Sequence, residues 1–419
     1  MADKTNSTGR QGGRSVGDNA LDLSGSGVFG RFVLGALSTI ENGRLTLSLP
    51  NGATHAFGGS HQSGLHGVMA IHRWRALRRF ATGGDIGLAK SYIDGDWSSP
   101  DLTALFNLAI ANEANPMVWY AGTRLANGIN WIRHLLRDNT KRGSRRNIAY
   151  HYDLGNAFYG RWLDRTMTYS SAYYSHPDMS LEQAQTAKYD CILEIGEIEA
   201  GHKVLEIGSG WGGFAKRAAE RQIKVHGITV SREQLSYCQK HLETASFDVK
   251  PDFSFTDYRD VDGSYDRIVS IEMFEAVGEK HWPDYFSVLH DRLCAGGVAV
   301  AQIITIENSR FEDYRSRTDF IQRFIFPGGQ LPSLEVLGEV IDAAGLQLEQ
   351  TEFFRLSYAR TLAEWNRRFQ KAWPELTELG FDKPFKRMWE YYLSYCEAGF
   401  GSGNIDVGLL KIRKPGNHQ

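Results

Sequence analysis

The feature that most constrains the fold is a glycine-dense turn directly after a short apolar run, near the middle of this 419-residue chain. The run His202–Ile207 has the composition of a buried parallel strand, and four glycines lie within residues 208–213. Residues 214–220 are strong helix formers without a breaker. A strand, a glycine turn and a helix N-terminus bring backbone N–H groups against a nucleotide. The sequence therefore predicts a nucleotide-containing cofactor at this turn.

Two classes of cofactor fit the turn. Gly208, Gly210 and Gly213 match the G-x-G-x-x-G pattern of dinucleotide sites. The second expected strand, however, ends at Thr229, where an NAD site is expected to carry an acidic ribose ligand. Glu206 lies inside the first strand, where a carboxylate suits a cofactor that carries an ammonium and a sulfonium charge. These two residues favour S-adenosylmethionine over a dinucleotide, and a purely structural turn is the weakest interpretation.

Seven segments after residue 147 have the length and composition of strands. Helical stretches lie between most of them, which predicts an α/β fold with a doubly wound, mostly parallel seven-stranded sheet. The expected strands are Lys203–Ile207, Lys224–Thr229, Phe253–Thr256, Asp266–Ile271, Gly297–Ile304, Glu349–Phe354 and Asp406–Ile412.

The chain divides into four parts by composition. Residues 1–29 are rich in small polar residues and are expected to be a disordered tail, and residues 30–115 are expected to form a smaller mixed α/β domain associated with lipid. Residues 116–146 combine an apolar, Trp-containing helix with a basic cluster, which is typical either of a segment on an anionic membrane or of a solvated linker. The sheet domain spans residues 147–413. Within the smaller domain the expected elements are a strand at Arg44–Pro50 and helices at Trp74–Ala81, Ile86–Tyr92 and Leu102–Ala111.

Charge and cysteine usage exclude several classes of protein. The formal net charge of −2 gives no reason to expect a nucleic-acid partner. The four cysteines are scattered without C-x-x-C spacing, so no zinc site, other metal site or disulfide framework is expected. No run approaches the roughly 20 apolar residues that span a bilayer. A cytoplasmic protein, bound peripherally to the inner face of the membrane, is the expectation.

Further motifs occur in a fixed order around the glycine turn. Because of these motifs and the glycine turn, the chain resembles the cyclopropane-fatty-acyl-phospholipid synthase family over roughly residues 75–413. This family includes the mycolic acid cyclopropane synthases. The resemblance implies a class I, Rossmann-like methyltransferase fold, S-adenosylmethionine as cofactor, unsaturated phospholipid acyl chains as substrate, and a homodimer. The motifs are His151–Asn156, Tyr169–Tyr173, Val230–Gln234, Asp257–Asp260, Met273–Glu275 and Phe324–Gly329.

The resemblance also implies which residues hold the cofactor. A pair of residues before the sheet binds the methionine carboxylate, the glycine turn approaches the methionine and ribose, and the ends of the next two strands surround the ribose and the adenine. Ser231 has a second interpretation, as the N-cap of the following helix. The implied cofactor residues are Tyr169, Ser170, Glu206, Gly208, Gly210, Gly212, Thr229, Val230, Ser231, Gln234, Tyr258 and Arg259.

The implied catalytic site departs from the family pattern. In the family, a Cys, a Glu, a His, a Tyr and a backbone group hold a bicarbonate that removes a proton during ring closure. Here Ser171 stands at the Cys position and Gln302 at the His position, while Glu275, Tyr358 and the backbone of Ile304 are retained. Neutral side chains can still hydrogen-bond an anion, so bicarbonate stays open as a second cofactor. Glu275 acting as the base is the alternative.

The expected reaction is transfer of a one-carbon unit from S-adenosylmethionine to the cis double bond of a phospholipid acyl chain through a carbocation. A cyclopropane is one expected product, and a methyl-branched or methylated unsaturated chain is the other. An NAD-dependent oxidoreductase and a non-catalytic lipid-binding relative are more distant hypotheses.

Overall fold

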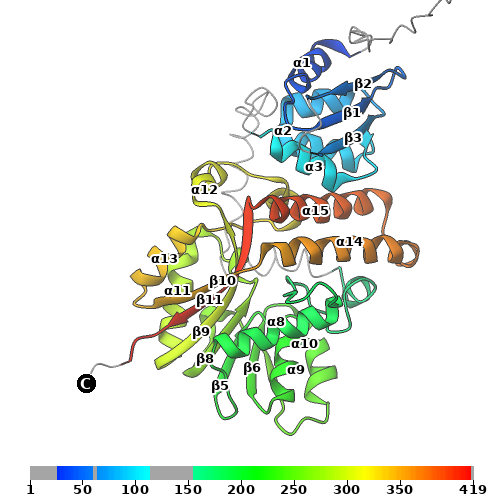
Figure 1. Ribbon diagram of the computed structural model, residues 1–419. Coiled ribbons are helices and arrows are strands. Elements are labelled where there is room, and N and C mark those ends of the chain that lie inside the picture. The colour runs from blue at the N-terminus through cyan, green and yellow to red at the C-terminus, as the bar shows by residue number, and fades with distance from the viewer. Residues whose placement is uncertain (1–25, 60–63, 114–153, 417–419) are drawn as a thin grey trace, which may run out of the picture.

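Two β-sheets form the framework of the protein. The computed structural model describes residues 26–59, 64–113 and 154–416, and Figure 1 shows the smaller sheet in the N-terminal unit and the larger one in the C-terminal part. The small sheet has the strand order β2-β1-β3-β4, and the large sheet has the order β10-β11-β9-β8-β5-β6-β7. The predicted residues 116–146 lie outside the described residues.

The large sheet confirms the predicted fold class. Adjacent strands are parallel from β7 through β6, β5 and β8 to β9, whereas β11 is antiparallel to both β9 and β10. Two predicted strands have the observed bounds, and the others differ at their ends. The strands are β5 Lys203–Ile207, β6 Lys224–Thr229, β7 Asp252–Phe255, β8 Tyr265–Ile271, β9 Leu293–Ile306, β10 Gln347–Phe353 and β11 Ile405–Arg413.

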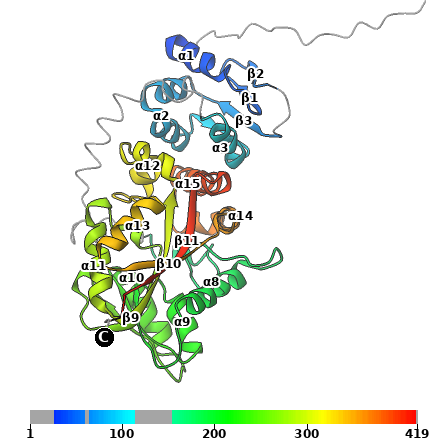
Figure 2. The same ribbon diagram turned by 60° about the vertical axis from the view of Figure 1, so that its left-hand side comes forward.

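Helices cover both faces of the large sheet (Figures 1 and 2). Successive side chains of β5 point to opposite faces, so Val204 joins the apolar cluster with α8 and α9 while Leu205 joins the cluster with α11 and α13. This three-layer packing fixes the carboxyl ends of the parallel strands along one edge. The helices are α8 Leu181–Ile195, α9 Gly213–Glu220 and α10 Arg232–Cys238 on one face, and α11 Trp282–Arg292 and α13 Leu334–Ala343 on the other.

The N-terminal unit departs from the sequence prediction at its start. Helix α1 begins at Gly27, so residues 27–29 are helical and do not belong to a disordered tail. The two helices expected after residue 73 are both present within the element α2, on either side of a break at Gly84 (φ 57°, ψ −139°). The elements are α1 Gly27–Leu37, β1 Arg44–Ser48, β2 Thr54–Phe57, β3 His66–Ile71, α2 Arg75–Ile93, β4 Trp97–Ser98 and α3 Leu102–Ala111.

Two long helices, α14 (Arg355–Glu378) and α15 (Lys383–Ser402), join the two parts of the molecule. Helix α15 packs against α14 on one side and against α2 and α3 on the other, as Figure 1 shows. Its Arg387 donates hydrogen bonds to the backbone oxygens of Tyr92 and Trp97. The N-terminal unit is therefore anchored on a helix of the C-terminal part.

Short helical segments complete the structure. Residues 310–332 contain most of α12 and a π-helical turn. Within the part of the chain described here, no helix is both long and apolar enough to cross a membrane. The remaining segments are α7 Asn156–Tyr159, α12 Asn308–Arg315, π-helical turns at Gln239–Glu243 and Ile321–Ile325, and 3₁₀ turns at Tyr258–Asp260, Phe274–Ala276 and Glu279–His281.

Candidate active site

The glycine turn connects β5 to α9 with three left-handed glycines. Gly208 (φ 82°), Gly210 (φ 53°) and Gly212 (φ 79°) adopt backbone angles that a side chain disfavours. A Cβ atom on Gly212 would lie 2.3 Å from Cδ1 of Leu242, whereas Gly210 has open space around it. Gly212 is thus required by packing, and Gly210 leaves room for a ligand against the backbone.

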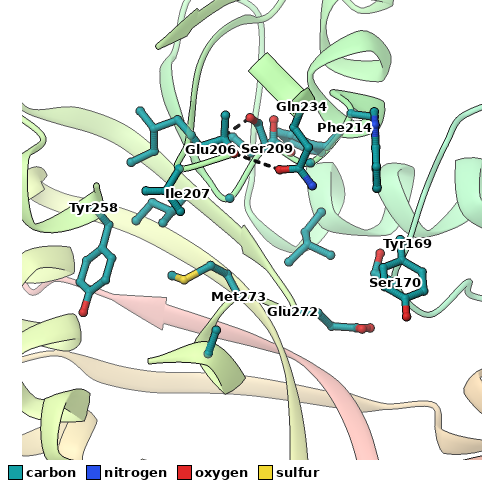
Figure 3. A pocket seen from close by; sticks show the side chains of 18 of the residues that line it. Tyr169, Ser170, Glu206, Ile207, Ser209, Phe214, Gln234, Tyr258, Glu272 and Met273 are labelled. Atoms are coloured by element: carbon teal, nitrogen blue, oxygen red, sulfur yellow. Dashed lines mark hydrogen bonds between the residues drawn. The ribbon is translucent and has the colours of Figure 1, made fainter. Parts of the chain in front are cut away.

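A cavity lies beside this turn, at the carboxyl ends of β5, β6 and β8 (Figure 3). Two of the predicted cofactor residues do not line it. Gly212 supports the start of α9, and the hydroxyl of Ser231 accepts a hydrogen bond from the backbone N–H of Gln234 as the N-cap of α10. The predicted residues that do line the cavity are Tyr169, Ser170, Glu206, Gly208, Gly210, Thr229, Val230, Gln234, Tyr258 and Arg259.

Glu206 supplies a buried negative charge to this cavity. Its side chain is almost fully buried, and its Oε2 atom has no hydrogen-bond partner among the described residues. Burial raises the pKa of Glu206 to about 8, although the nearby positive charge of Lys188 opposes that shift. An ammonium group that donates to Oε2 would satisfy this atom and hold the carboxylate ionised. The orphaned oxygen therefore fits S-adenosylmethionine, whose methionine part carries an ammonium.

Lys188 of α8 is a buried cation that sequence reasoning missed. Its Nζ atom donates to Oγ of Ser170 at 2.5 Å. Burial lowers the pKa of Lys188 to about 7, and the carboxylates of Glu272 and Glu206 counteract that shift. Because Ser170 lines the cavity, Lys188 places positive charge directly behind it. This arrangement suits the methionine carboxylate that the resemblance assigns to Tyr169 and Ser170.

Polar residues after β6 and β7 complete the far end of the cavity. The hydroxyl of Thr229 donates to Oε1 of Gln234 at 2.9 Å, which orients the amide toward the cavity (Figure 3). The guanidinium of Arg259 pairs with Asp257 at 2.8 Å and lies 5.2 Å from the ring centre of Tyr258. Hydroxyl and amide groups suit a ribose, and the Tyr258 ring offers a flat apolar surface for a base.

Glu272, directly after β8, contacts three of the five catalytic residues that the sequence predicted. Its Oε1 atom accepts hydrogen bonds from the backbone N–H of Ser171 at 2.8 Å and from Nε2 of Gln302 at 2.6 Å. Its Oε2 atom accepts a hydrogen bond from the hydroxyl of Tyr358 at 2.6 Å. Glu272 lines the cavity, and in Figure 3 it points toward Tyr169 and Ser170.

Glu275, the predicted catalytic carboxylate, does not line the cavity. Its Oε1 atom accepts a hydrogen bond from the backbone N–H of Ile304 at 2.6 Å, and its Oε2 atom is buried without a partner among the described residues. Burial, helped by the nearby charge of Glu272, raises the pKa of Glu275 to about 8. Glu275 therefore contacts the backbone of Ile304 directly, while the carboxylate beside the cofactor space is Glu272.

Most hydrogen-bond donors of the predicted anion site are already used within the protein. The N–H groups of Ser171 and Ile304 and the hydroxyl of Tyr358 each have one hydrogen, and each already donates to Glu272 or Glu275. The Ser171 hydroxyl donates to Ala172, and the amide of Gln302 gives one of its two hydrogens to Glu272, so one N–H remains. An added anion would also lie beside the half-buried carboxyl groups of Glu272 and Glu275, which repel it when they are ionised. Because one N–H is too little to hold a buried anion, the residues present do not fit bicarbonate.

A weak signal for Glu272 was present in the sequence. Two glutamates three residues apart, Glu272 and Glu275, follow the apolar run of β8. Only the three-dimensional path shows which one faces the cavity, because a 3₁₀ turn at Phe274–Ala276 redirects the chain between them. Lys188 gave no signal, since a single lysine on a predicted helix is normally a surface residue.

Comparison with known proteins identifies the family of this chain. The family model described as mycolic acid cyclopropane synthetase matches residues 139–410. Tuberculostearic acid methyltransferase UfaA1 of Mycobacterium tuberculosis is 39% identical over 353 residues, which cover 80% of this chain and 81% of that protein. Cyclopropane-fatty-acyl-phospholipid synthase of Escherichia coli K12 is 34% identical over 340 residues, which cover 79% and 84% of the two chains.

A solved structure agrees with the fold and the cofactor. Mycolic acid cyclopropane synthase CmaA1, complexed with SAH and CTAB, is similar with a TM-score of 0.61 and 31% identity, covering 64% of this chain and 98% of that one. The glycine turn, the orphaned oxygen of Glu206 and these matches agree on one cofactor. The chain belongs to the mycolic acid cyclopropane synthetase family of methyltransferases, and its cofactor is S-adenosylmethionine.

Proposed function

We propose that this enzyme adds a one-carbon unit to the cis double bond of an unsaturated phospholipid acyl chain and forms a cyclopropane through a carbocation. The observation that carries the proposal is the position of Glu272, a half-buried carboxylate that lines the cofactor cavity and can accept the proton released in the reaction. S-adenosylmethionine supplies an electrophilic methyl group. The π electrons of the alkene serve as the nucleophile, so no base is needed to activate it.

Aromatic side chains beside the cavity support a cationic reaction. Tyr169 lines the cavity, and its ring centre lies 5.1 Å from that of Trp365. Tyr358 contacts Trp365 edge-on at 6.2 Å, and the hydroxyls of Tyr169 and Tyr392 are 3.0 Å apart. The faces of such rings stabilise a positive charge without forming a bond to it, and they keep water away from it.

A methylated unsaturated chain is the alternative product. The relative with 39% identity is named a tuberculostearic acid methyltransferase, and Ser171 and Gln302 replace the Cys and His of the family's anion site. The same carbocation gives such a product when a proton is lost without ring closure. A saturated methyl branch would in addition need a hydride donor, which lies outside the reaction proposed here.

Isotope labelling separates these products. The chain would be expressed in a host that lacks its own synthase and is fed methyl-deuterated methionine, and the fatty acids would be analysed by mass spectrometry. We expect a cyclopropane that keeps two deuterium atoms, because one leaves the added methyl group as the ring closes. A methylated internal alkene keeps three, and an exocyclic methylene keeps two but shows vinylidene protons by NMR. Lipids without any deuterium would contradict the proposed function.

We also propose that α1 contacts the membrane surface where the substrate resides. Val28, Phe29 and Phe32 of this helix are 81%, 45% and 47% exposed, although Val33 and Leu34 are buried against the N-terminal unit. A helix that is apolar on its outer face as well as its inner face needs an apolar environment on both sides. The acyl-chain substrate makes a bilayer surface the appropriate environment.

Flotation with anionic phospholipid vesicles tests this contact. We expect Phe29→Ser combined with Phe32→Ser to reduce vesicle binding by about tenfold, because each substitution removes apolar area from the interface. Leu356→Ser provides the matched control, since Leu356 is 63% exposed at the start of α14 in the C-terminal part. Equal flotation of the double variant and the unmodified protein would contradict the role of α1.

A further inference from the structure

We propose that Glu272 is a built-in base that takes the place of bicarbonate in this enzyme, so that catalysis needs no free anion. The inference rests on the proposed function, because it names the group that removes the proton from the lipid. Its basis is the disagreement between the anion site that the family resemblance implies and the hydrogen bonds found there.

The donors of the implied site converge on Glu272. The side chains of Gln302 and Tyr358, which the resemblance assigns to an exchangeable anion, each donate to a carboxylate oxygen of Glu272 at 2.6 Å. At Ser171 the backbone N–H donates to Glu272 at 2.8 Å, whereas the hydroxyl donates to the backbone oxygen of Ala172. The chain therefore supplies its own carboxylate to these three donors.

The hydrogen bonding of Glu272 leaves one position for a proton. A carboxylate offers about four lone-pair positions, two on each oxygen. Oε1 accepts from two donors and Oε2 accepts from one, so Oε2 keeps one position free with respect to the hydrogen bonds described here. Burial raises the pKa of Glu272, which makes the carboxylate a better proton acceptor, while the charge of Lys188 limits the shift.

The backbone at Glu272 is consistent with a functional constraint. Glu272 has φ 48°, in the left-handed region that residues with a side chain seldom occupy. Such a conformation costs about 1 kcal/mol or more and persists where the surrounding structure enforces it. A glycine at this position would relieve the strain and leave a space bounded by the donors from Ser171, Gln302 and Tyr358.

The reaction begins at the double bond of the acyl chain. The alkene π electrons form a carbon–carbon bond to the methyl carbon, the carbon–sulfur bond breaks, and its electron pair remains on sulfur. The neighbouring chain carbon becomes cationic. Glu272 then removes a proton from the added methyl group, and the electron pair of that C–H bond closes the ring on the cationic carbon. Glu272 leaves this step as a neutral acid and gives its proton to water when the product departs.

Anion rescue tests this role, with deuterated-methyl transfer to unsaturated phospholipid vesicles as the assay. We expect Glu272→Gln to lower product formation by at least about 100-fold, because an amide cannot accept the proton. Glu272→Gly should lose activity similarly and regain at least about tenfold with added formate or bicarbonate, which occupies the vacated space. Removal of bicarbonate from the buffer should change the activity of the unmodified enzyme by less than about twofold.

Tyr358→Phe is the control for rescue. It removes one donor to Glu272 but opens no space for an anion, so we expect reduced activity that formate does not restore. Binding of S-adenosylmethionine and the denaturation midpoint, measured for each variant, separate a lost base from a misfolded chain. Full activity of Glu272→Gln, failure of every anion to rescue folded Glu272→Gly, or a bicarbonate requirement of the unmodified enzyme would each overturn the inference. No label transfer by the unmodified enzyme would instead refute the proposed function.

Discussion

Substitution of Glu206 by glutamine is expected to weaken the binding of S-adenosylmethionine by about 100-fold, which corresponds to roughly 2.7 kcal/mol. The reason is the buried Oε2 atom, which has no hydrogen-bond partner among the described residues and lies next to the cofactor space. The amide keeps the shape of the side chain but replaces an anionic acceptor, and loss of a buried charge pair costs several kcal/mol. Isothermal titration calorimetry measures the effect.

The pH dependence of binding provides a second measure of Glu206. Its pKa of about 8 in the cofactor-free protein means that a proton must leave before the carboxylate can pair with the cofactor's ammonium. Affinity should therefore rise by up to tenfold per unit as the pH increases toward 8. Above that pH the α-amino group of the cofactor, with an ordinary pKa of about 7.7–8.0, loses its charge and affinity should fall again.

The glutamine variant should lose the rise on the acid side. Glu199→Gln is the matched surface control, because Glu199 is exposed and lies before β5, and we expect it to leave both affinity and pH profile unchanged. An unaltered dissociation constant for Glu206→Gln would show that the carboxylate does not recognise the cofactor.

Substitution of Gly212 by alanine is expected to lower the free energy of unfolding by about 2–5 kcal/mol. The left-handed backbone (φ 79°, ψ 22°) disfavours alanine by about 1–2 kcal/mol. The new Cβ atom would also lie 2.3 Å from Leu242 and 3.2 Å from Sγ of Cys238, and such overpacking costs about 1–3 kcal/mol. Chemical denaturation followed by fluorescence measures the loss.

Gly403 separates the two contributions. It has nearly the same backbone conformation (φ 85°, ψ 8°), but the nearest atom to an added Cβ is Cζ of Arg355 at 3.6 Å, an ordinary contact. Gly403→Ala should therefore cost only about 1–2 kcal/mol, from the backbone alone. If both alanine variants lost the same stability, the close approach of Leu242 to the turn would be disproved.

The elements that could be predicted were those with a strong local pattern. Strands β5 and β6 have the predicted bounds because each is a short run rich in apolar residues that ends at the sheet edge where the cofactor cavity lies. The small polar residues before α1 predict a tail that includes its first turn, although that turn is helical. Gly83 and Gly84 predict an interruption within α2, and the structure has a break at that point.

By itself, the sequence determined the cofactor class and the family. The strand–turn–helix order, Glu206 and Thr229 are local features of the sequence. They indicate directly that the cofactor carries a positive charge that a carboxylate can bind. The tertiary structure alone decided which carboxylate lies beside the cofactor. Ser171, Glu272, Gln302 and Tyr358 are separated by up to 187 residues, and they meet because the ends of β8, β9 and α14 are brought together by packing. Which donor binds which carboxylate depends on distances and directions in the folded protein, and the order of residues along the chain does not give these.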